Sequence, residues 1–153
     1  EKGKGLVDKD IHLDATIAPS GDVSITLADT MASVMHTLMP NARIRSEGER
    51  TVLPSDMQPG DILPDASSSA IAGAIRYTVK ASDRHAVRKE SLTTPAGTFD
   101  CIVVLEHKEE KAGPYNRVTN AYTWYSPGVG MVRHDTYDRN MKLDTSEVLQ
   151  SIE

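Results

Sequence analysis

The residues of this chain best suited to acid–base or metal chemistry are its histidines. Imidazole titrates near neutral pH and binds metals, so two histidines beside carboxylates could hold a metal ion or move a proton. His107 and His134 are such a pair, because they adjoin Glu106 and Asp135 on segments expected to be neighbouring strands. No two of the 5 histidines have a zinc-site spacing such as His-x-x-x-His, so we favour solvent-facing polar positions and expect no metal. The other three are His12, His36 and His85.

Nucleophilic catalysis has no better support in the sequence. The run of Ser67, Ser68 and Ser69 lacks the Gly-x-Ser-x-Gly pattern of a hydrolase elbow and is expected to be a loop. The segment 128–130 has two glycines but neither the lysine nor the helix that a phosphate-binding loop needs. Cys101 is the sole cysteine, so no intrachain disulfide can form, and its strand context predicts a small buried side chain. We therefore expect a protein that is not an enzyme and uses no cofactor.

Aromatic side chains offer binding chemistry instead. Tyr122 and Trp124 are two residues apart on one expected strand and therefore share a face. Together with Tyr77 and Met131 they could line a cavity for an apolar ligand, because a barrel of about eight strands can hold one small molecule. The alternative is that these side chains are ordinary core or barrel wall. We predict the four as ligand-binding positions.

These side chains lie on segments in which apolar and polar residues alternate, the pattern of strands that bury one face. The segment 31–38 differs, since Met31, Val34, Met35 and Leu38 recur at helical spacing and predict one short amphipathic helix. We count roughly nine strands, at the spacing of sandwiches and barrels. They cover residues 11–17, 23–27, 42–53, 71–79, 84–93, 99–109, 118–125, 131–137 and 143–152.

Two proline–glycine phrases, residues 93–101 and 124–132, mark changes of direction between these strands. Proline fixes φ and glycine supplies a positive φ, so each phrase specifies a turn. Consecutive strands joined by short turns form an antiparallel meander, whose exposed edges must be closed, curled away or covered. Strands missing upstream would leave an edge that a partner protomer could cover.

Size and charge narrow the class of protein. With 153 residues the chain is expected to form one domain, residues 1–153. Its net charge of −5, without a dense cluster of Lys and Arg, argues against a nucleic-acid partner. It has no apolar run of transmembrane length, and its charged start at Glu1–Gly5 is what a mature exported protein or a trimmed chain would show.

Three phrases together form a wider pattern. They are the turn-rich segment 52–65, the Thr-Pro-Ala-Gly-Thr-Phe-Asp-Cys run that ends at Cys101, and the Trp-Tyr-Ser-Pro-Gly-Val-Gly-Met-Val run that begins at Trp124. Their order and spacing over about residues 44–153 resemble the 3108-like family of domains of unknown function, exported proteins common in Bacteroidetes. One departure is Met141, which stands where the family usually has the Gly of a final Asn-Gly turn.

The resemblance implies a mainly β fold: an antiparallel meander that forms a closed or half-open β-barrel with one short helix, similar in shape to lipoprotein carriers. It implies no catalytic residues. We therefore expect a periplasmic or outer-membrane-associated protein that binds an apolar ligand or lipid within a curved sheet. The alternative is a structural or assembly module that pairs through a sheet edge with a second copy or another envelope protein.

Overall fold

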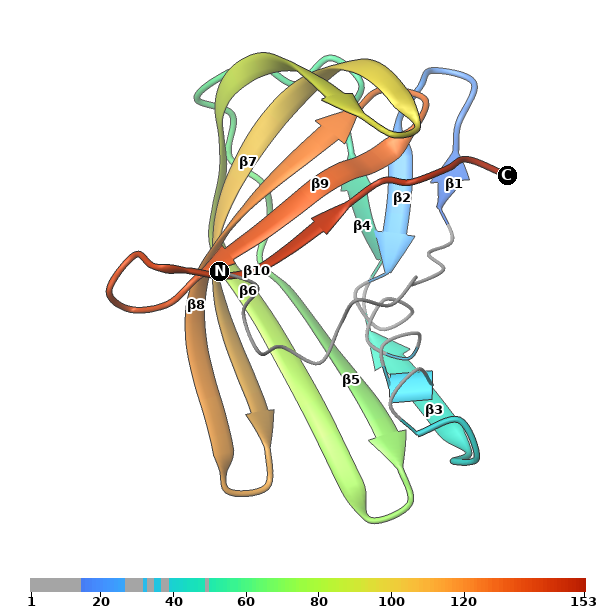
Figure 1. Ribbon diagram of the computed structural model, residues 1–153, viewed down its shortest axis with the longest axis vertical. Coiled ribbons are helices and arrows are strands. Elements are labelled where there is room, and N and C mark those ends of the chain that lie inside the picture. The colour runs from blue at the N-terminus through green and yellow to red at the C-terminus, as the bar shows by residue number, and fades with distance from the viewer. Residues whose placement is uncertain (1–14, 27–31, 33–34, 37–38, 49) are drawn as a thin grey trace.

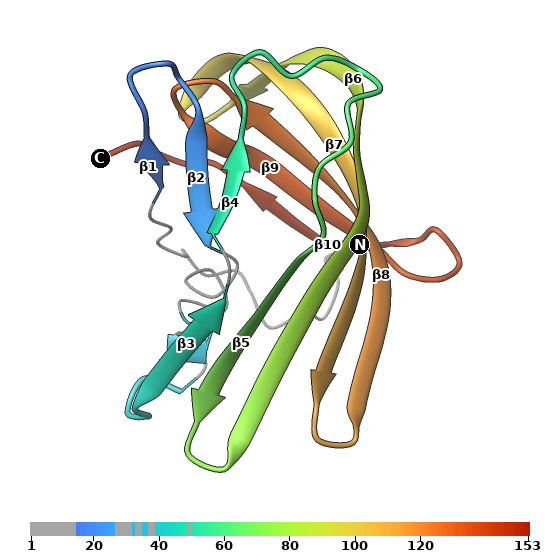
Figure 2. The ribbon, with the colours of Figure 1, turned by 180° about the vertical axis from the view of Figure 1, so that it is seen from behind.

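The computed structural model describes residues 15–26, 32, 35–36, 39–48 and 50–153, and these residues form ten strands. Figures 1 and 2 show them from opposite sides. The strands are β1 (Thr16–Ile17), β2 (Val23–Thr26), β3 (Ile44–Gly48), β4 (Arg50–Leu53), β5 (Ala66–Ala72), β6 (Ile75–Thr94), β7 (Gly97–Ala112), β8 (Tyr115–Ser126), β9 (Gly130–Tyr137) and β10 (Leu143–Val148).

The strands make two antiparallel sheets. The large sheet has the order β10-β9-β8-β7-β6-β5-β3, and the small one has the order β1-β2-β4. The predicted meander is confirmed from β5 onward, where each strand pairs with the next one in the chain. The small sheet packs across the upper part of the large one, as oriented in Figure 1. The expected mainly β, antiparallel fold is therefore observed.

The predicted barrel is not closed within the described residues. β10 and β3 form the two margins of the large sheet and do not pair with each other there. The sheet is nevertheless strongly twisted, because β6 has register shifts between Ser82 and His85 and between Ala86 and Arg88. Bulges of this kind bend a strand and increase its twist. The result is an open, curved sheet (Figure 2).

Several predicted boundaries change in the structure. The expected strand 42–53 is two strands in different sheets, β3 and β4. Ser67, Ser68 and Ser69, expected to form a loop, lie within β5. Of the predicted helix 31–38, the described residues Ala32, Met35 and His36 are helical, and the rest of it lies outside the described residues. Most of the expected strand 11–17, with His12, also lies outside them.

The last hairpin shows how the departure from the family pattern is accommodated. Met141 adopts a φ of 58°, the left-handed conformation that glycine takes most easily. The carboxylate of Asp138 accepts hydrogen bonds from the backbone amides of Asn140 (2.8 Å) and Lys142 (3.0 Å). The turn therefore keeps a left-handed residue despite the side chain.

Buried side chains form three clusters on the two faces of the large sheet. Side chains of β7 alternate between the faces, so Ile102 and Val104 point one way and Cys101 and Val103 the other. The upper cluster is Val23, Leu53, Met57, Leu63, Ala86, Ile102, Val104 and Tyr125. The lower cluster, on the same face, is Met35, Ala70, Ala72 and Val79, with Met39, Ala42, Ile44 and Tyr77 against it. The outer cluster, on the opposite face, is Cys101, Val103, Trp124 and Val132, with Tyr122 among the residues against it.

Candidate functional site

The structure does not bring the four predicted ligand residues together. Tyr122 and Trp124 share a face, as expected, and belong to the outer cluster. Tyr77 packs against the lower cluster and Met131 against the upper one, both on the opposite face. A single pocket lined by all four is therefore absent from the described part of the chain.

Protein groups already surround Trp124. Its indole Nε1 donates to a carboxylate oxygen of Glu90 at 2.8 Å. The guanidinium groups of Arg88 and Arg133 lie 5.9 and 5.1 Å from the ring centroid, within reach of cation–π attraction. Arg133 is bound in turn by Asp135, with both carboxylate oxygens 3.0 Å from its Nε. This part of the outer face is thus a satisfied network of charged and aromatic groups.

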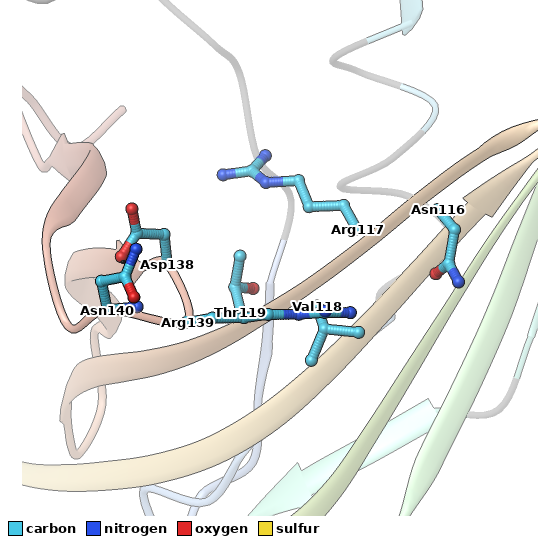
Figure 3. Close-up of a pocket in the computed structure, with 7 residues that line it drawn as sticks. All are labelled: Asn116, Arg117, Val118, Thr119, Asp138, Arg139 and Asn140. Carbon is cyan, nitrogen blue, oxygen red and sulfur yellow. Dashed lines mark hydrogen bonds between the residues drawn. The ribbon is translucent and has the colours of Figure 1, made fainter.

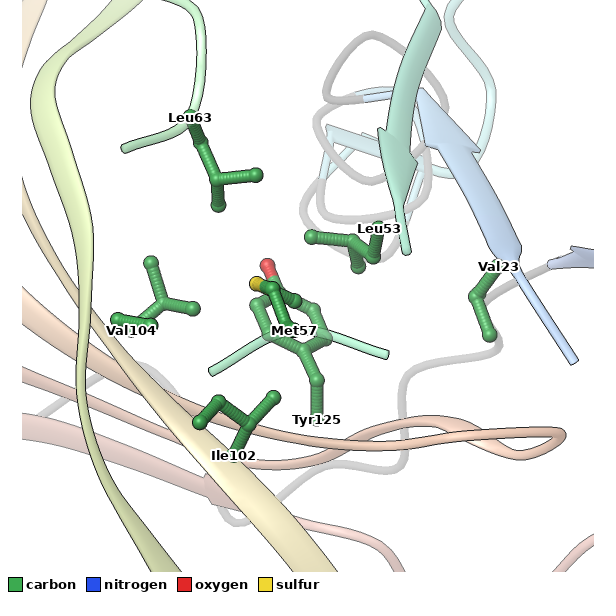
Figure 4. Close-up of a cluster of buried hydrophobic side chains, with 8 residues drawn as sticks. Val23, Leu53, Met57, Leu63, Ile102, Val104 and Tyr125 are labelled. Carbon is green, nitrogen blue, oxygen red and sulfur yellow. The ribbon is translucent and has the colours of Figure 1, made fainter. Parts of the chain in front are cut away.

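The side chains of the upper cluster, drawn in Figure 4, leave little free space between them. The space left between Val23, Leu53, Met57 and Tyr125 is about 10 Å³. A water molecule needs about 10–15 Å³ of such space, so no larger molecule fits without rearrangement. Met131 packs against this cluster and is best described as core.

The lower cluster is built differently. Its floor consists of small side chains, with Ala70 fully buried, Val79 at 3% exposure and Ala72 at 7%. Its cover is supplied by Met35 and Met39, which come from the segment that precedes β3. The floor fills little volume, so flexible methionines supply much of its cover, alongside Ile44 and Tyr77.

Tyr77 lies at the margin of the lower cluster. Its hydroxyl donates to a carboxylate oxygen of Glu110 at 2.6 Å. Burial and this hydrogen bond raise the pKa of Tyr77, so the phenol stays protonated. Its ring faces apolar groups and its hydroxyl faces the carboxylate of Glu110. This arrangement suits the boundary of a binding surface.

A group of polar side chains, here called the polar band, lies on the same face as the upper and lower clusters. It consists of Arg84, Glu106, Lys108, Thr123 and His134. Arg84 and Glu106 form a buried ion pair there, with Nε and a carboxylate oxygen 3.0 Å apart and exposures of 3% and 4%. His134 contacts Lys108 (3.4 Å between Nζ and Nε2) and Thr123 (2.7 Å between Nδ1 and Oγ1). Burial and the positive charge of Lys108 lower the pKa of His134 to about 3.

The two histidines singled out by the sequence do not form a pair. His134 is opposite Thr123 on the face of the polar band, whereas His107 pairs with Asn120 on the other face. Within the described residues, no group of three or more His, Cys, Asp and Glu side chains could hold a metal ion. Cys101 is buried, as expected, and burial raises the pKa of its thiol to about 11.

A cleft that sequence reasoning missed lies beside β8 (Figure 3). Its volume is about 380 Å³, within the usual range for ligand sites. The sequence predicted strands 118–125 and 131–137 of nearly equal length, whereas β8 has 12 residues and β9 has 8, so β8 extends beyond the end of β9. It is lined by Asn116, Arg117, Val118, Thr119, Asp138, Arg139 and Asn140.

Comparison with known proteins adds the family. A model of a family described as DUF3108-like matches residues 1–149. The chain belongs to the DUF3108-like family. No well-characterised protein matches it.

Two crystal structures share the DUF3108-like chain's fold. One, a candidate exported protein with a YmcC-like fold from Bacteroides fragilis, is 22% identical, with a TM-score of 0.71. The other, a candidate lipoprotein from Parabacteroides distasonis, is 21% identical, with a TM-score of 0.72. Each match covers 92% of this chain and 84% of the other. In the described part of the DUF3108-like chain, no helix has the length and apolar character needed to cross a bilayer.

The phrases that identified the DUF3108-like family serve as joints between elements. In the segment 52–65, the amide of Gly60 donates to the carbonyl of Ala86 at 2.8 Å, and the amide of Leu63 donates to that of Arg84 at 2.8 Å. These bonds fix the segment to β6 at its register shifts. In the phrase that begins at Trp124, the amide of Gly128 donates to the carbonyl of Gly21 at 3.0 Å and ties the two sheets together.

Proposed function

We propose that this protein is a non-enzymatic protein of the cell envelope that binds an apolar ligand or lipid within its curved sheet. The ligand would lie on the face that carries the upper and lower clusters. The binding surface is the lower cluster, and the open sheet acts as a half-open barrel around it. Of the four residues predicted from the sequence, Tyr77 takes part directly. Tyr122, Trp124 and Met131 support the frame.

The observation that carries this proposal is the small-residue floor beneath methionines. Ala70 and Val79 have small side chains, and among the described residues Met35 and Met39 pack over them together with Ala42, Ile44 and Tyr77. Methionine side chains are unbranched and adapt to different shapes, so an acyl chain could take their place with little change in contact. In the upper cluster an acyl chain could not replace a side chain in this way, because the free space there is about that of one water molecule.

Placement in the envelope is supported by the family and its structural neighbours. The two similar crystal structures are described as a candidate exported protein and a candidate lipoprotein. We extend that placement, periplasmic or associated with the outer membrane, to this chain as part of the proposal. Cell fractionation of the full-length protein in its native host tests it, and recovery in the cytoplasm would contradict it.

Ligand binding is tested by native mass spectrometry of the protein purified from envelopes, followed by titration with a fluorescent fatty acid. The variant Ala70→Leu places a larger side chain on the floor and should weaken binding at least about tenfold. Ser67→Leu is the matched control, because Ser67 is exposed on the opposite face of the same strand. Equal binding by the wild type and Ala70→Leu would contradict the proposal.

A second candidate function is assembly through a sheet edge. β10 is hydrogen-bonded only to β9 in the described residues, and Leu143 and Val148 on it are exposed. An edge strand of this kind is a template for pairing with another chain. Sedimentation velocity over a range of concentrations tests pairing with a second copy. A monomer at all concentrations would leave only another envelope protein as the partner.

A further inference from the structure

We propose that the end of the molecule formed by the hairpins β5–β6 and β7–β8 and the start of β3 docks on the surface of an anionic lipid bilayer. This end is here called the lower tip and consists of residues 41–47, 72–77 and 111–116. The inference rests on the proposed function and deepens it, since it names a bilayer as the place where the ligand of the lower cluster is taken up or released.

The fold gathers the lower tip from three separate segments of the chain. Ile44, the first residue of β3, pairs with Ala72 at the end of β5. Tyr77, near the start of β6, pairs with Ala112 at the end of β7. Figures 1 and 2 show the two hairpins projecting from the same end of the molecule, with the start of β3 beside them. Residues that are far apart in the sequence therefore act on one surface.

Large apolar side chains are exposed on both hairpins of the lower tip. Ile75 is 51% exposed and Tyr115 is 47% exposed. The residues between the paired strands, 73–74 and 113–114, are Gly-Ala and Gly-Pro and have no polar side chain. Apolar side chains on a docking surface enter the boundary between lipid headgroups and acyl chains. Tyrosine is favoured at this boundary, because its ring is apolar and its hydroxyl is polar.

These exposed side chains continue the lower cluster to the end of the sheet. Ile75 is opposite Ala72, and Tyr115 is opposite Ala112, which pairs in turn with Tyr77. Residues directly opposite each other share a face of the sheet, so both exposed side chains lie on the face of the lower cluster. An acyl chain that left a bilayer at the lower tip would therefore meet apolar side chains on its way to the cluster.

The charge of the lower tip selects an anionic surface. The tip has four exposed basic side chains and one exposed acidic side chain, a net charge of +3 in a chain whose net charge is −5. The basic residues are Arg43, Arg45, Arg76 and Lys111, and the acidic residue is Glu47. Basic side chains near an anionic membrane are attracted to it, and each strengthens binding about fivefold.

Glu47 does not neutralise this charge. Its carboxylate lies 3.9 Å from Arg45 and 4.0 Å from Arg76, and all three side chains are more than half exposed. Contacts of this length between exposed groups are weak, and one carboxylate cannot compensate two guanidinium groups. Lys111 forms no ion pair with any of the described residues. The charge of the tip is therefore available to lipid headgroups.

An exposed apolar side chain elsewhere lacks this setting. Ile62 is 84% exposed, yet its segment, residues 54–65, carries three aspartates and no basic residue. An anionic surface would repel that segment. The lower tip also has the shape for a bilayer, because two projecting turns can enter a fluid surface that deforms around them, whereas a protein partner would need two matching pockets.

The first test is vesicle flotation of the wild-type protein. Binding to vesicles of phosphatidylcholine with about one-third phosphatidylglycerol should be at least about tenfold stronger than binding to phosphatidylcholine alone. Raising the salt concentration from about 0.1 M to about 1 M should weaken it, because salt screens the attraction. Equal binding to both kinds of vesicle, or binding to neither, would overturn the proposal.

The site is located on the wild type with a spin-labelled lipid in the same vesicles. Amide NMR signals of residues 43–45, 73–76 and 112–115 should be broadened most, because these residues would lie nearest the label. This measurement needs no substitution, so it decides the place of docking whether or not a variant folds. Broadening confined to the last hairpin, residues 138–142, would overturn the assignment to the lower tip.

The apolar contribution is measured with the double variant Ile75→Ser with Tyr115→Ser. It should bind the anionic vesicles at least about tenfold more weakly, because two side chains no longer enter the bilayer. The matched control is Ile62→Ser with Met141→Ser, which removes side chains that are 84% and 54% exposed elsewhere. The control should bind as the wild type does, and an equal loss in both double variants would contradict the proposal.

The charge contribution is measured with Arg76→Gln with Lys111→Gln. Loss of two basic groups should weaken binding to the anionic vesicles about 25-fold and leave binding to neutral vesicles unchanged. Arg139→Gln with Lys142→Gln removes the same charge from exposed positions of the last hairpin and should have little effect. If the two double variants lose equally, net charge and not the lower tip governs binding.

Docking and ligand binding can fail separately. Ile75→Ser with Tyr115→Ser should still bind the fluorescent fatty acid in solution, whereas Ala70→Leu should still float with anionic vesicles. A wild type that floats with vesicles but binds no fatty acid would contradict the proposed function and leave docking in place. A wild type that binds the fatty acid but does not float would overturn docking alone.

Discussion

The upper and lower clusters lie on the same face of one sheet, yet they are built in opposite ways. The upper cluster joins two sheets through branched and aromatic side chains, such as Leu53, Ile102 and Tyr125, and is filled. The lower cluster sets small residues of β5 and β6 beneath Met35 and Met39. Filled packing suits stability, whereas the proposed function requires that the methionine cover of the lower cluster can be exchanged.

The largest effect is expected at the buried ion pair in the polar band. Glu106→Ala should lower the free energy of unfolding by about 3–5 kcal/mol, because it leaves the charge of Arg84 buried and unpaired. Urea unfolding followed by circular dichroism measures the change. If the two clusters are independent, the loss should be confined to one of two transitions, and a single transition would show that they unfold as one unit.

The control for the ion pair is the double variant Arg84→Met with Glu106→Leu, which removes both charges at similar volume. It should recover most of the lost stability, since neither charge is then left unpaired. A double variant as unstable as Glu106→Ala would show that the geometry of the pair, and not its charge, holds this part of the sheet.

The comparison of the clusters is tested directly by truncation in each. Leu53→Ala in the upper cluster should cost about 3 kcal/mol, because the rigid neighbours leave a cavity. Met35→Ala in the lower cluster should cost only about 2 kcal/mol, the low end for a buried methionine, because the remaining cover can settle onto the floor. Thermal and urea unfolding of the two variants measure the costs. Equal costs would remove the distinction between a filled and an exchangeable cluster.

The sequence allowed the strands β7 to β10 to be predicted because their apolar residues alternate and most of their turns carry proline or glycine. β5, where residues 67–69 were expected to form a loop, and β6, which was expected as parts of two strands, were not predicted. Pro95 with Gly97, and Pro127 with Gly128, end strands where expected. The division of 42–53 into β3 and β4 was not predictable, since alternation identifies a strand but not the sheet to which it belongs. Barrel closure likewise depends on which strands pair with each other, and the pattern within a single strand does not predict it.

The candidate site was predicted less well than the fold. Period two placed Tyr122 and Trp124 on a common face, which is correct, but it could not place Tyr77 and Met131 relative to them. The register shifts in β6, between Ser82 and Arg88, change which side chains meet across the sheet and leave no simple mark in the sequence. The cleft beside β8 depends on where β9 turns away, and strand ends are the least certain part of a pattern.

The pH dependence of stability should arise partly from His134, in the polar band. Its pKa is lowered to about 3 in the folded protein, from 6.5 for the free side chain. Between these values the unfolded chain binds a proton that the folded chain does not, so the free energy of unfolding falls as the pH is lowered from about 6.5 to 3. The slope from this one group is at most about 1.4 kcal/mol per pH unit.

The contribution of His134 is isolated by comparing the wild type with His134→Gln at several pH values. The stability difference between them should shift in favour of the variant as the pH falls through this window. His107→Gln is the matched control, because His107 lies on the opposite face and bonds Asn120 at 3.3 Å. A difference that is constant with pH would show that the pKa of His134 is the same in the folded and the unfolded protein and would contradict the prediction.

The smallest effect on stability is expected at the last hairpin, which lies outside both clusters. Met141 holds a left-handed φ of 58°, a conformation that costs a residue with a Cβ about 1–2 kcal/mol. Met141→Gly removes that cost but gives the unfolded chain more freedom, so the net gain in stability should be about 0.5–1 kcal/mol. Met141→Ala, which keeps the Cβ, should show no gain. If both variants gain equally, the gain in stability comes from removing the exposed Met side chain and not from the backbone conformation. The turn would then hold no backbone strain.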